Sequence, residues 1–273
     1  MKMRMLVPIA VVIAFALSLV AVFGASQPST VSHQATAPKP PKPPIAYVET
    51  TNWVNYGQAE RAFAGDHSIR VIGPQYMLSP ALPTSQPLLV ILVGWGRVAM
   101  QRHVGASRFV EPRATFISLQ LPANVYWTWP EGIRLYLAWT MEGFGVKGSI
   151  PAGYLSHGKP VSSGLGYTPA VIAPQSDWSA VREAIGHHVT VITSAQALSN
   201  VPHWSIPGPP PPSVVVIVGY SPQESMRTVL AVRPRVGDVP ILVVMPPPDS
   251  SSAAVARVTK AVLRGYHFPV DTP

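Results

Sequence analysis

Residues 145–166 read GVKGSIPAGYLSHGKPVSSGLG and carry the strongest fold signal in the chain. A proline follows Ile150, alternating residues continue to Ser156, and His157-Gly158 precedes a second short strand that starts at Lys159. Glycine at such a turn supplies the positive φ that a tight two-stranded hairpin needs. We therefore expect a β-hairpin that is entered through a proline.

Strand and helix patterns alternate on both sides of this segment. Before it, strand-type apolar runs at 88–93 and 114–121 bracket a helical pattern over 97–108. A helix then follows Thr128-Trp129-Pro130-Glu131, which has the spacing of a capping box, and another is expected over 177–185. Short right-handed crossovers make the first two strands parallel, so the sequence predicts an α/β fold with a mixed central sheet.

The order V-x-G-x-x-P, a short strand, G-K-x-V and a later glycine resembles the back half of the thioredoxin fold. The resemblance covers residues 87–185 and, more weakly, 213–273, and it implies a mixed central sheet flanked by helices. It also implies a groove that holds an extended peptide through backbone hydrogen bonds. The residues expected to form that groove are Trp95, Gly96, Arg97, Ile150 and Pro151, and the equivalent turn of the second unit is Tyr220, Ser221 and Pro222.

The chain contains no cysteine. Thiol–disulfide exchange is therefore excluded, although it is the chemistry that the thioredoxin family performs at the turn before its first core helix. Ser221-Pro222 stands where that family has Cys-Pro, and together with Glu224 it has the spacing of a capping box with proline at the first helical position. We expect a protein without redox chemistry, and we assign no catalytic residue, metal or cofactor.

Charge and proline patterns divide the chain into segments. Lys2 and Arg4 precede 18 uncharged residues at 6–23, which predicts a signal peptide or a single-pass membrane anchor. The bulk of the chain is then extracytoplasmic at the cell membrane, or secreted if the signal is cleaved. The expected segments are this anchor (1–25), a Pro-rich linker (26–44), a lead-in segment (45–86), a thioredoxin-like domain (87–200), a second Pro-rich linker (201–212) and a partial thioredoxin-like βαβα unit (213–273).

The lead-in segment and the last unit are predicted in less detail. In the lead-in, a helix is expected near 58–64 and a strand near 68–72. The last unit has two strand patterns, 213–218 and 239–245, each followed by a helix, but the chain ends before a hairpin could complete it. Because an unpaired sheet edge invites aggregation, we expect this unit to pack against the first one.

The net charge of +8 favours anionic surfaces such as lipid headgroups or wall polymers. The local basic cluster comprises Arg97, Arg102, His103, Arg108 and Arg113. It lacks any nucleic-acid signature, and we interpret it as a solvated helix face. The expected partners are the membrane, through the N-terminal helix, and an extended peptide or a protein, but not nucleic acid. The function that follows is a peptide-binding or assembly scaffold.

Two alternatives remain open. Gly94-x-Gly96-x-x-Ala99 follows an apolar strand and opens a helix, which is the local glycine pattern of a pyrophosphate site in a nucleotide-dependent enzyme. The carboxylate expected near the end of the next strand is missing there, because residues 118–121 read SLQL. The second alternative is a purely structural surface protein.

His187-His188 predicts no metal site, because adjacent residues of a strand point to opposite faces.

Overall fold

The computed structural model describes residues 45–74, 88–127, 129–150, 169–187, 189–193, 214–268 and 270, all within one compact unit of residues 42–273. Its strands are β1 (Ala46–Thr50), β2 (Ile69–Ile72), β3 (Leu89–Val93), β4 (Thr115–Gln120), β5 (Ala170–Ile172), β6 (Thr190–Ile192), β7 (Val215–Val218) and β8 (Ile241–Met245). Its helices are α2 (Trp53–Ala62), α3 (Arg97–Val110), α4 (Ala123–Trp127), α5 (Glu131–Glu142), α6 (Trp178–Ile185), α8 (Pro222–Val236) and α9 (Ser252–Gly265).

The described strands form a single eight-stranded sheet in the order β2-β1-β3-β4-β8-β7-β5-β6. Neighbouring strands are parallel within each group of four, and the one antiparallel pair among them is β4–β8 at the centre. The central strands are buried over almost their whole length, because helices cover both faces of the sheet. This explains why their sequences are continuous apolar runs rather than alternating patterns.

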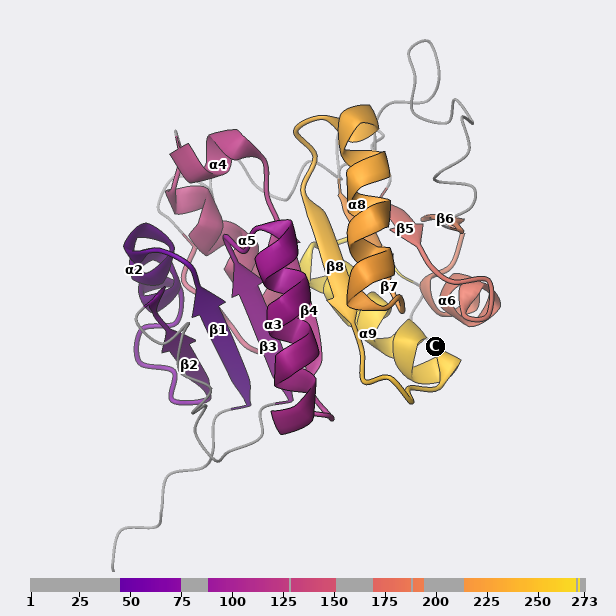
Figure 1. The fold of residues 1–273 in the computed structure, drawn as a ribbon, viewed down its shortest axis with the longest axis horizontal. Helices are drawn as coiled ribbons and strands as arrows, with labels where there is room; N and C mark the ends of the chain where they lie inside the picture. The colour runs from indigo at the N-terminus through magenta and orange to yellow at the C-terminus, as the bar shows by residue number, and fades with distance from the viewer. Residues whose placement is uncertain are drawn as a thin grey trace, which may run out of the picture. The chain divides into compact units, whose positions relative to one another are not determined.

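The helices form a layer on each face of the sheet (Figure 1). Residues of α2, α5, α6 and α9 pack with one face into the larger hydrophobic core. Residues of α3 and α8 pack with the other face into a second core. The second layer therefore consists of two helices, which lie beside each other across the central strand pair.

The two halves of the sheet are structural repeats. Each half has the same strand order relative to its own sequence, since β2-β1-β3-β4 corresponds to β6-β5-β7-β8. Ser118 of β4 lies opposite Val243 of β8, and these residues are 125 positions apart. The same offset relates Gly94 to Gly219, both with positive φ at the turn that follows a buried strand. The described residues therefore have an approximate two-fold axis that passes between Ser118 and Val243.

Helices α5 and α9 obey the same symmetry where they cross. A Cβ atom on Gly143 would collide with the carbonyl oxygen of Ala261, and one on Gly265 would collide with the carbonyl oxygen of Trp139. Glycine is required at both positions because the two backbones touch there. The contact joins the two repeats on the face of the sheet opposite to α3 and α8.

Much of the expected α/β pattern is confirmed. The predicted runs at 88–93 and 114–121 are β3 and β4, and they are parallel neighbours. The unit 213–273 does pack against the preceding one, because β8 pairs with β4 and β7 pairs with β5. The capping box at Ser221 is present, with Glu224 N donating to Ser221 Oγ and Ser221 N donating to the Glu224 carboxylate.

Other expectations differ from the structure or fall outside it. Helix α5 begins at Glu131 with Pro130 at its N-cap and no side-chain cap, so the predicted capping box is wrong there. Strands β1 and β5 were not anticipated. The expected hairpin lies beyond Ile150, outside the described residues, as do both Pro-rich linkers and the N-terminal segment. Both edges of β3 are occupied, by β1 and β4, so a hairpin over 151–166 would have no place beside β3.

Candidate functional site

The turn after β3 is packed tightly against the end of β1. Gly94 has a φ of 77°, and a Cβ atom there would collide with the side chains of Thr51 and Asn55. The Thr51 hydroxyl donates to the Gly94 carbonyl oxygen at 3.0 Å. The next residue, Trp95, is only 6% exposed, and its indole Nε1 donates to the backbone carbonyl of Glu49 at 3.3 Å. The turn thus holds an indole ring over the end of β1.

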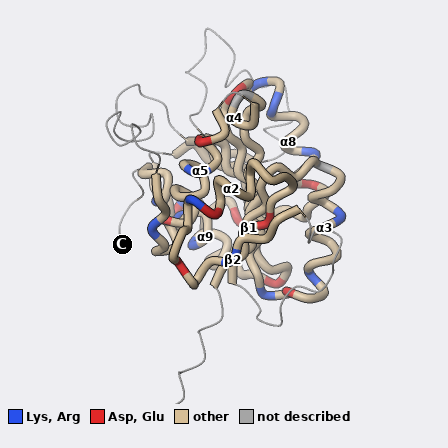
Figure 2. Tube along the Cα trace, turned by 90° about the vertical axis from the view of Figure 1, so that its left-hand side faces the viewer, with Lys and Arg blue, Asp and Glu red and all other residues tan. Residues whose placement is uncertain are grey.

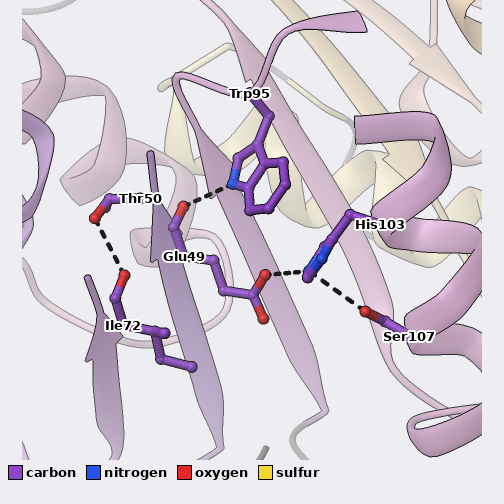
Figure 3. Close-up of polar contacts among 6 residues, drawn as sticks. All are labelled: Glu49, Thr50, Ile72, Trp95, His103 and Ser107. Carbon is purple, nitrogen blue, oxygen red and sulfur yellow. Dashed lines mark hydrogen bonds and ion pairs between the residues drawn. The ribbon is translucent and has the colours of Figure 1, made fainter. Parts of the chain in front are cut away.

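Beneath this ring lies a set of ionisable and hydroxyl side chains, here called the polar cluster: Glu49, His103, Ser107 and Glu111. Glu49 comes from β1, and His103 and Ser107 lie four residues apart on one face of α3 (Figure 3). Glu111, four residues further along the chain, is the C-cap residue of α3. The Glu49 carboxylate forms an ion pair with His103 Nε2, and the Ser107 hydroxyl lies 3.3 Å from the same nitrogen. The Trp95 ring stacks on the His103 ring, with 4.3 Å between centroids.

The arrangement around His103 differs from that of a serine hydrolase. In a Ser–His–acid triad, the acid binds one ring nitrogen and the nucleophile binds the other. Here Glu49 and Ser107 both contact Nε2. The imidazole therefore cannot relay a proton from Ser107 to Glu49 through its two nitrogens. What the contacts do accomplish is to join α3 to β1.

Glu111 is the most isolated member of the polar cluster. It caps the C-terminus of α3 and is 2% exposed, and neither carboxylate oxygen has a hydrogen-bond partner among the described residues. Burial, and then the negative charge of Glu49, raise the pKa of Glu111 from 4.5 to about 7, while His103 opposes the shift. A carboxyl group in this environment can gain or lose a proton near neutral pH.

The second repeat shows what these positions hold when they serve packing alone. Glu49 pairs with Leu92 of β3, as Ile172 pairs with Ile217 of β7, so Ile172 is the counterpart of Glu49. Along the helices, the offset of 125 positions between the N-caps Gly96 and Ser221 gives the other counterparts. Those of His103, Ser107 and Glu111 are Thr228, Val232 and Val236, all buried.

The first repeat therefore replaces ordinary core residues with ionisable ones. Ile172, Val232 and Val236 belong to the hydrophobic core between the sheet and α8. Burying a carboxylate without a full set of partners costs several kcal/mol, which the second repeat avoids. Sequence reasoning missed the polar cluster, because it assigned His103 and Arg108 to a solvated helix face. Instead, Arg108 donates to the backbone carbonyls of Ala114, Met245 and Pro246 at 2.5, 2.6 and 2.7 Å.

An open groove lies on the outer side of this layer, between α3 and α8. It has a volume of about 780 Å³ and is here called the α3–α8 groove. Its apolar walls include Val98, which is 64% exposed, and Leu230, which is 49% exposed, and Met226 in it is buried. The full lining is Gly96, Val98, Ala99, Gln101, Gln223, Met226, Arg227 and Leu230.

The helices that border the groove carry more basic than acidic residues (Figure 2). Arg227 lines the groove, and Arg102 is an exposed residue of α3 next to Gln101. Glu224 is the one acidic residue within α3 and α8, and it is bound in the Ser221 capping box. The groove therefore combines exposed apolar walls with one lining cation, Arg227, and lies between two helices in which basic residues outnumber acidic ones.

The structure separates the predicted site residues. Gly96 lines the α3–α8 groove, whereas Trp95 is buried in the core beside it. Ile150 lies with α2 and α5 on the opposite face of the sheet, where its neighbour Ser149 donates to Ala62 O at 2.7 Å. Trp95 and Ile150 are therefore not brought together. The side chain of Arg97 and all of Pro151 lie outside the described residues.

The turn of the second unit has a structural role. Ser221 is the N-cap of α8, Pro222 is its first residue, and Tyr220 packs against the core beneath α8. Gln223, the next residue, lines the α3–α8 groove. Of the predicted site residues, Gly96 therefore lines the groove, whereas Tyr220, Ser221 and Pro222 do not.

The glycine turn of the alternative nucleotide hypothesis is already filled by protein side chains. Thr51 and Asn55 occupy the space in front of Gly94. At the end of β4, Gln120 donates to Ser118 Oγ at 2.7 Å and lies 3.4 Å from the Trp95 carbonyl oxygen. An amide thus stands where a ribose-binding carboxylate would be expected.

The described residues contain no group of three or more His, Cys, Asp or Glu side chains that could hold a metal ion. None of the helices described is both long and apolar enough to cross a bilayer.

The chain matches no protein-family model, no curated protein and no solved structure. The second repeat therefore serves as the reference for the first.

Proposed function

We propose that this chain is a membrane-anchored, extracytoplasmic scaffold that binds a peptide segment of a partner protein in the α3–α8 groove and performs no redox chemistry. The observation that carries the proposal is the pair of large apolar side chains exposed in the groove. Val98 and Leu230 extend from different helices into one open depression. Exposed apolar side chains that share a groove are typical of protein interaction sites.

The partner segment is amphipathic and acidic. Its apolar side chains would contact Val98, Met226 and Leu230, and its carboxylates would lie near Arg227 and Arg102. Complementary charge increases the association rate and fixes the orientation of the bound segment. The absence of cysteine agrees with a binding role, because the chain has no thiolate to act on the segment that it holds.

The thioredoxin-like relationship and the N-terminal anchor belong to the same proposal. The unit β3–α3–β4, with a glycine-aromatic turn before the helix, supports the first. The uncharged run at 6–23 behind two basic residues supports the second. Coordinates for 151–168 would test the fold relationship. Since β3 has no open edge, a hairpin that pairs with β2 or β6 would mean a departure from thioredoxin topology.

The binding proposal is tested with two fluorescein-labelled peptides and the full-length protein in detergent. In one peptide, pairs of leucines alternate with glutamates. The other peptide has the same sequence with each glutamate replaced by lysine. We expect saturable binding of the acidic peptide, measured by fluorescence anisotropy, and at least about tenfold weaker binding of the basic one. Leu230→Asp should abolish binding, because it places a charge in the apolar wall.

Phe109→Asp is the matched control. Phe109 is an exposed apolar residue of α3 (91%) that does not line the groove. It should leave the affinity for the acidic peptide unchanged. If the acidic peptide does not bind saturably, or if Phe109→Asp weakens it as much as Leu230→Asp, the groove is not the binding site. Saturable binding of a nicotinamide or flavin nucleotide would instead favour the enzyme alternative.

A further inference from the structure

The polar cluster differs from its counterpart in the second repeat in a way that packing does not explain. Each repeat places one helix over the corresponding strands of its own half of the sheet, and the second repeat fills the space with Ile172, Val232 and Val236. The first repeat places two carboxylates there, Glu49 at 3% and Glu111 at 2% exposure. Apolar residues therefore fit these positions in this fold, but the first repeat has carboxylates there instead.

The charges of the polar cluster do not balance when both carboxyl groups are ionised. His103 supplies at most one positive charge, and it is already paired with Glu49. Among the described residues, Glu111 has no hydrogen-bond donor for either carboxylate oxygen. A proton on Glu111 removes the excess negative charge and the repulsion from Glu49. The geometry therefore makes Glu111 a site where binding of one proton changes the electrostatic repulsion between α3 and the sheet.

Several of the elements that pack around α3 carry charged or titratable groups. His103 and Glu49 interact with Glu111 electrostatically. Arg108 of α3 is turned toward the carbonyls of Ala114, Met245 and Pro246, and Arg233 of α8 donates to Gln120 O. Further ionisable residues on this face of the first repeat are Tyr47 of β1, which is buried, and three exposed arginines: Arg70 of β2, Arg102 of α3 and Arg113, which follows α3.

The polar cluster lies on the inner face of the helix that forms one wall of the groove. His103, Ser107 and Glu111 face the sheet, while Val98 and Ala99, at the start of α3, line the groove. When Glu111 loses its proton, the uncompensated charge weakens the attachment of α3 to the sheet. The buried residues of α8 include no carboxylate, so its contact with the sheet has no such dependence. A change in the position of α3 on the sheet therefore alters the distance between α3 and α8.

We propose that the polar cluster is a proton-binding site that controls the position of α3 on the sheet and thereby the width of the α3–α8 groove. The groove is narrow and well ordered when Glu111 is protonated and wider when it is ionised. The link to partner binding rests on the proposed function. The link between protonation of Glu111 and the position of α3 is independent of the proposed function.

The absence of cysteine makes a clean distance measurement available, because introduced thiols are the only ones in the chain. Spin labels are attached to Val98→Cys and Leu230→Cys in the full-length protein, and the distance between them is measured by pulsed EPR from pH 5 to pH 8.5. We expect the distribution to broaden and to move to longer distance as pH rises, with a midpoint near neutrality. A label pair on exposed positions of the second repeat, Ser179→Cys and Ala253→Cys, should not change.

Two backgrounds decide the outcome. Glu111→Gln keeps the size of the side chain and removes its ionisation, so it should abolish the pH-dependent shift. The combined variant Glu49→Ile, His103→Thr, Ser107→Val and Glu111→Val introduces the residues of the second repeat and should also abolish it. A shift that persists in Glu111→Gln, or no shift in the wild-type background, overturns the proposal even if the acidic peptide binds. A shift that requires Glu111 supports it even if the peptide does not bind.

Discussion

The stability of the protein should depend on pH through Glu111, and this prediction can be worked out in free energy. In the folded chain the pKa of Glu111 is raised from 4.5 to about 7, chiefly by burial. The folded state therefore holds this proton more tightly than the unfolded state does. Stability from this group is fully present below pH 4.5, falls as pH rises through 7 and is lost above it. The full effect is about 3 kcal/mol.

Glu111→Gln is the perturbation that isolates this effect. Between pH 5 and pH 8 the group should reduce the wild-type free energy of unfolding by about 2–3 kcal/mol, and Glu111→Gln should lack that reduction. Burying an amide also has a cost, but that cost is the same at both pH values. The measured quantity is therefore the difference between the two pH values rather than the stability at either one.

The assay is urea denaturation of the full-length protein in detergent, followed by tryptophan fluorescence at pH 5 and pH 8. The matched control is Glu183→Gln, which neutralises an exposed carboxylate of α6. It should leave the wild-type difference between the two pH values unchanged. If Glu111→Gln alters stability equally at pH 5 and pH 8, Glu111 is not the titrating group, and the assignment of its proton is refuted.

Four further substitutions test the architecture around the site. Gly143→Ala should destabilise the fold by about 3 kcal/mol or more, since the new Cβ meets the Ala261 carbonyl, whereas Gly105→Ala in open space on α3 should stabilise it by about 0.5–1 kcal/mol. Thermal unfolding of the two variants gives the comparison. Arg108→Ala should cost about 3 kcal/mol in urea denaturation, because three backbone carbonyls lose their charged donor. Ser221→Ala should cost about 1 kcal/mol through loss of the helix cap, and an unchanged midpoint would contradict the capping box.

Most of the elements that sequence reasoning located have buried positions that serve packing; α3, expected over 97–108, also carries part of the polar cluster. Strands β3, β4, β7 and β8 are long apolar runs, because both faces of each strand are buried. Helix α8 carries a complete capping box, and α9 has Ser251 at its N-cap, whose hydroxyl accepts from Ala254 N at 3.3 Å. In these segments local preference and tertiary environment agree, so the pattern can be read from the chain.

The elements that were missed have identifiable reasons. Strand β1 is fully buried but contains Glu49, and a carboxylate interrupts the apolar run that marks a central strand. Strand β5 has only three residues, which is too short for a periodic signal. The α3–α8 groove could not be predicted because it joins residues about 125 positions apart, and only the pairing of β4 with β8 brings their helices together.

The failure at β1 is itself informative. A buried glutamate in a central strand is costly, and a sequence that keeps one departs from the pattern that would make its fold easiest to read. The second repeat supplies the direct comparison, since its strand β5 has isoleucine at the corresponding position and its helix α8 has valine at the counterparts of Ser107 and Glu111. Two copies of one architecture thus diverge at the positions that lie between α3 and the sheet. Both repeats adopt the same fold, so the fold does not require the buried carboxylates. Because these residues lower stability and occur in one repeat alone, a function of that repeat explains them better than a requirement of the fold.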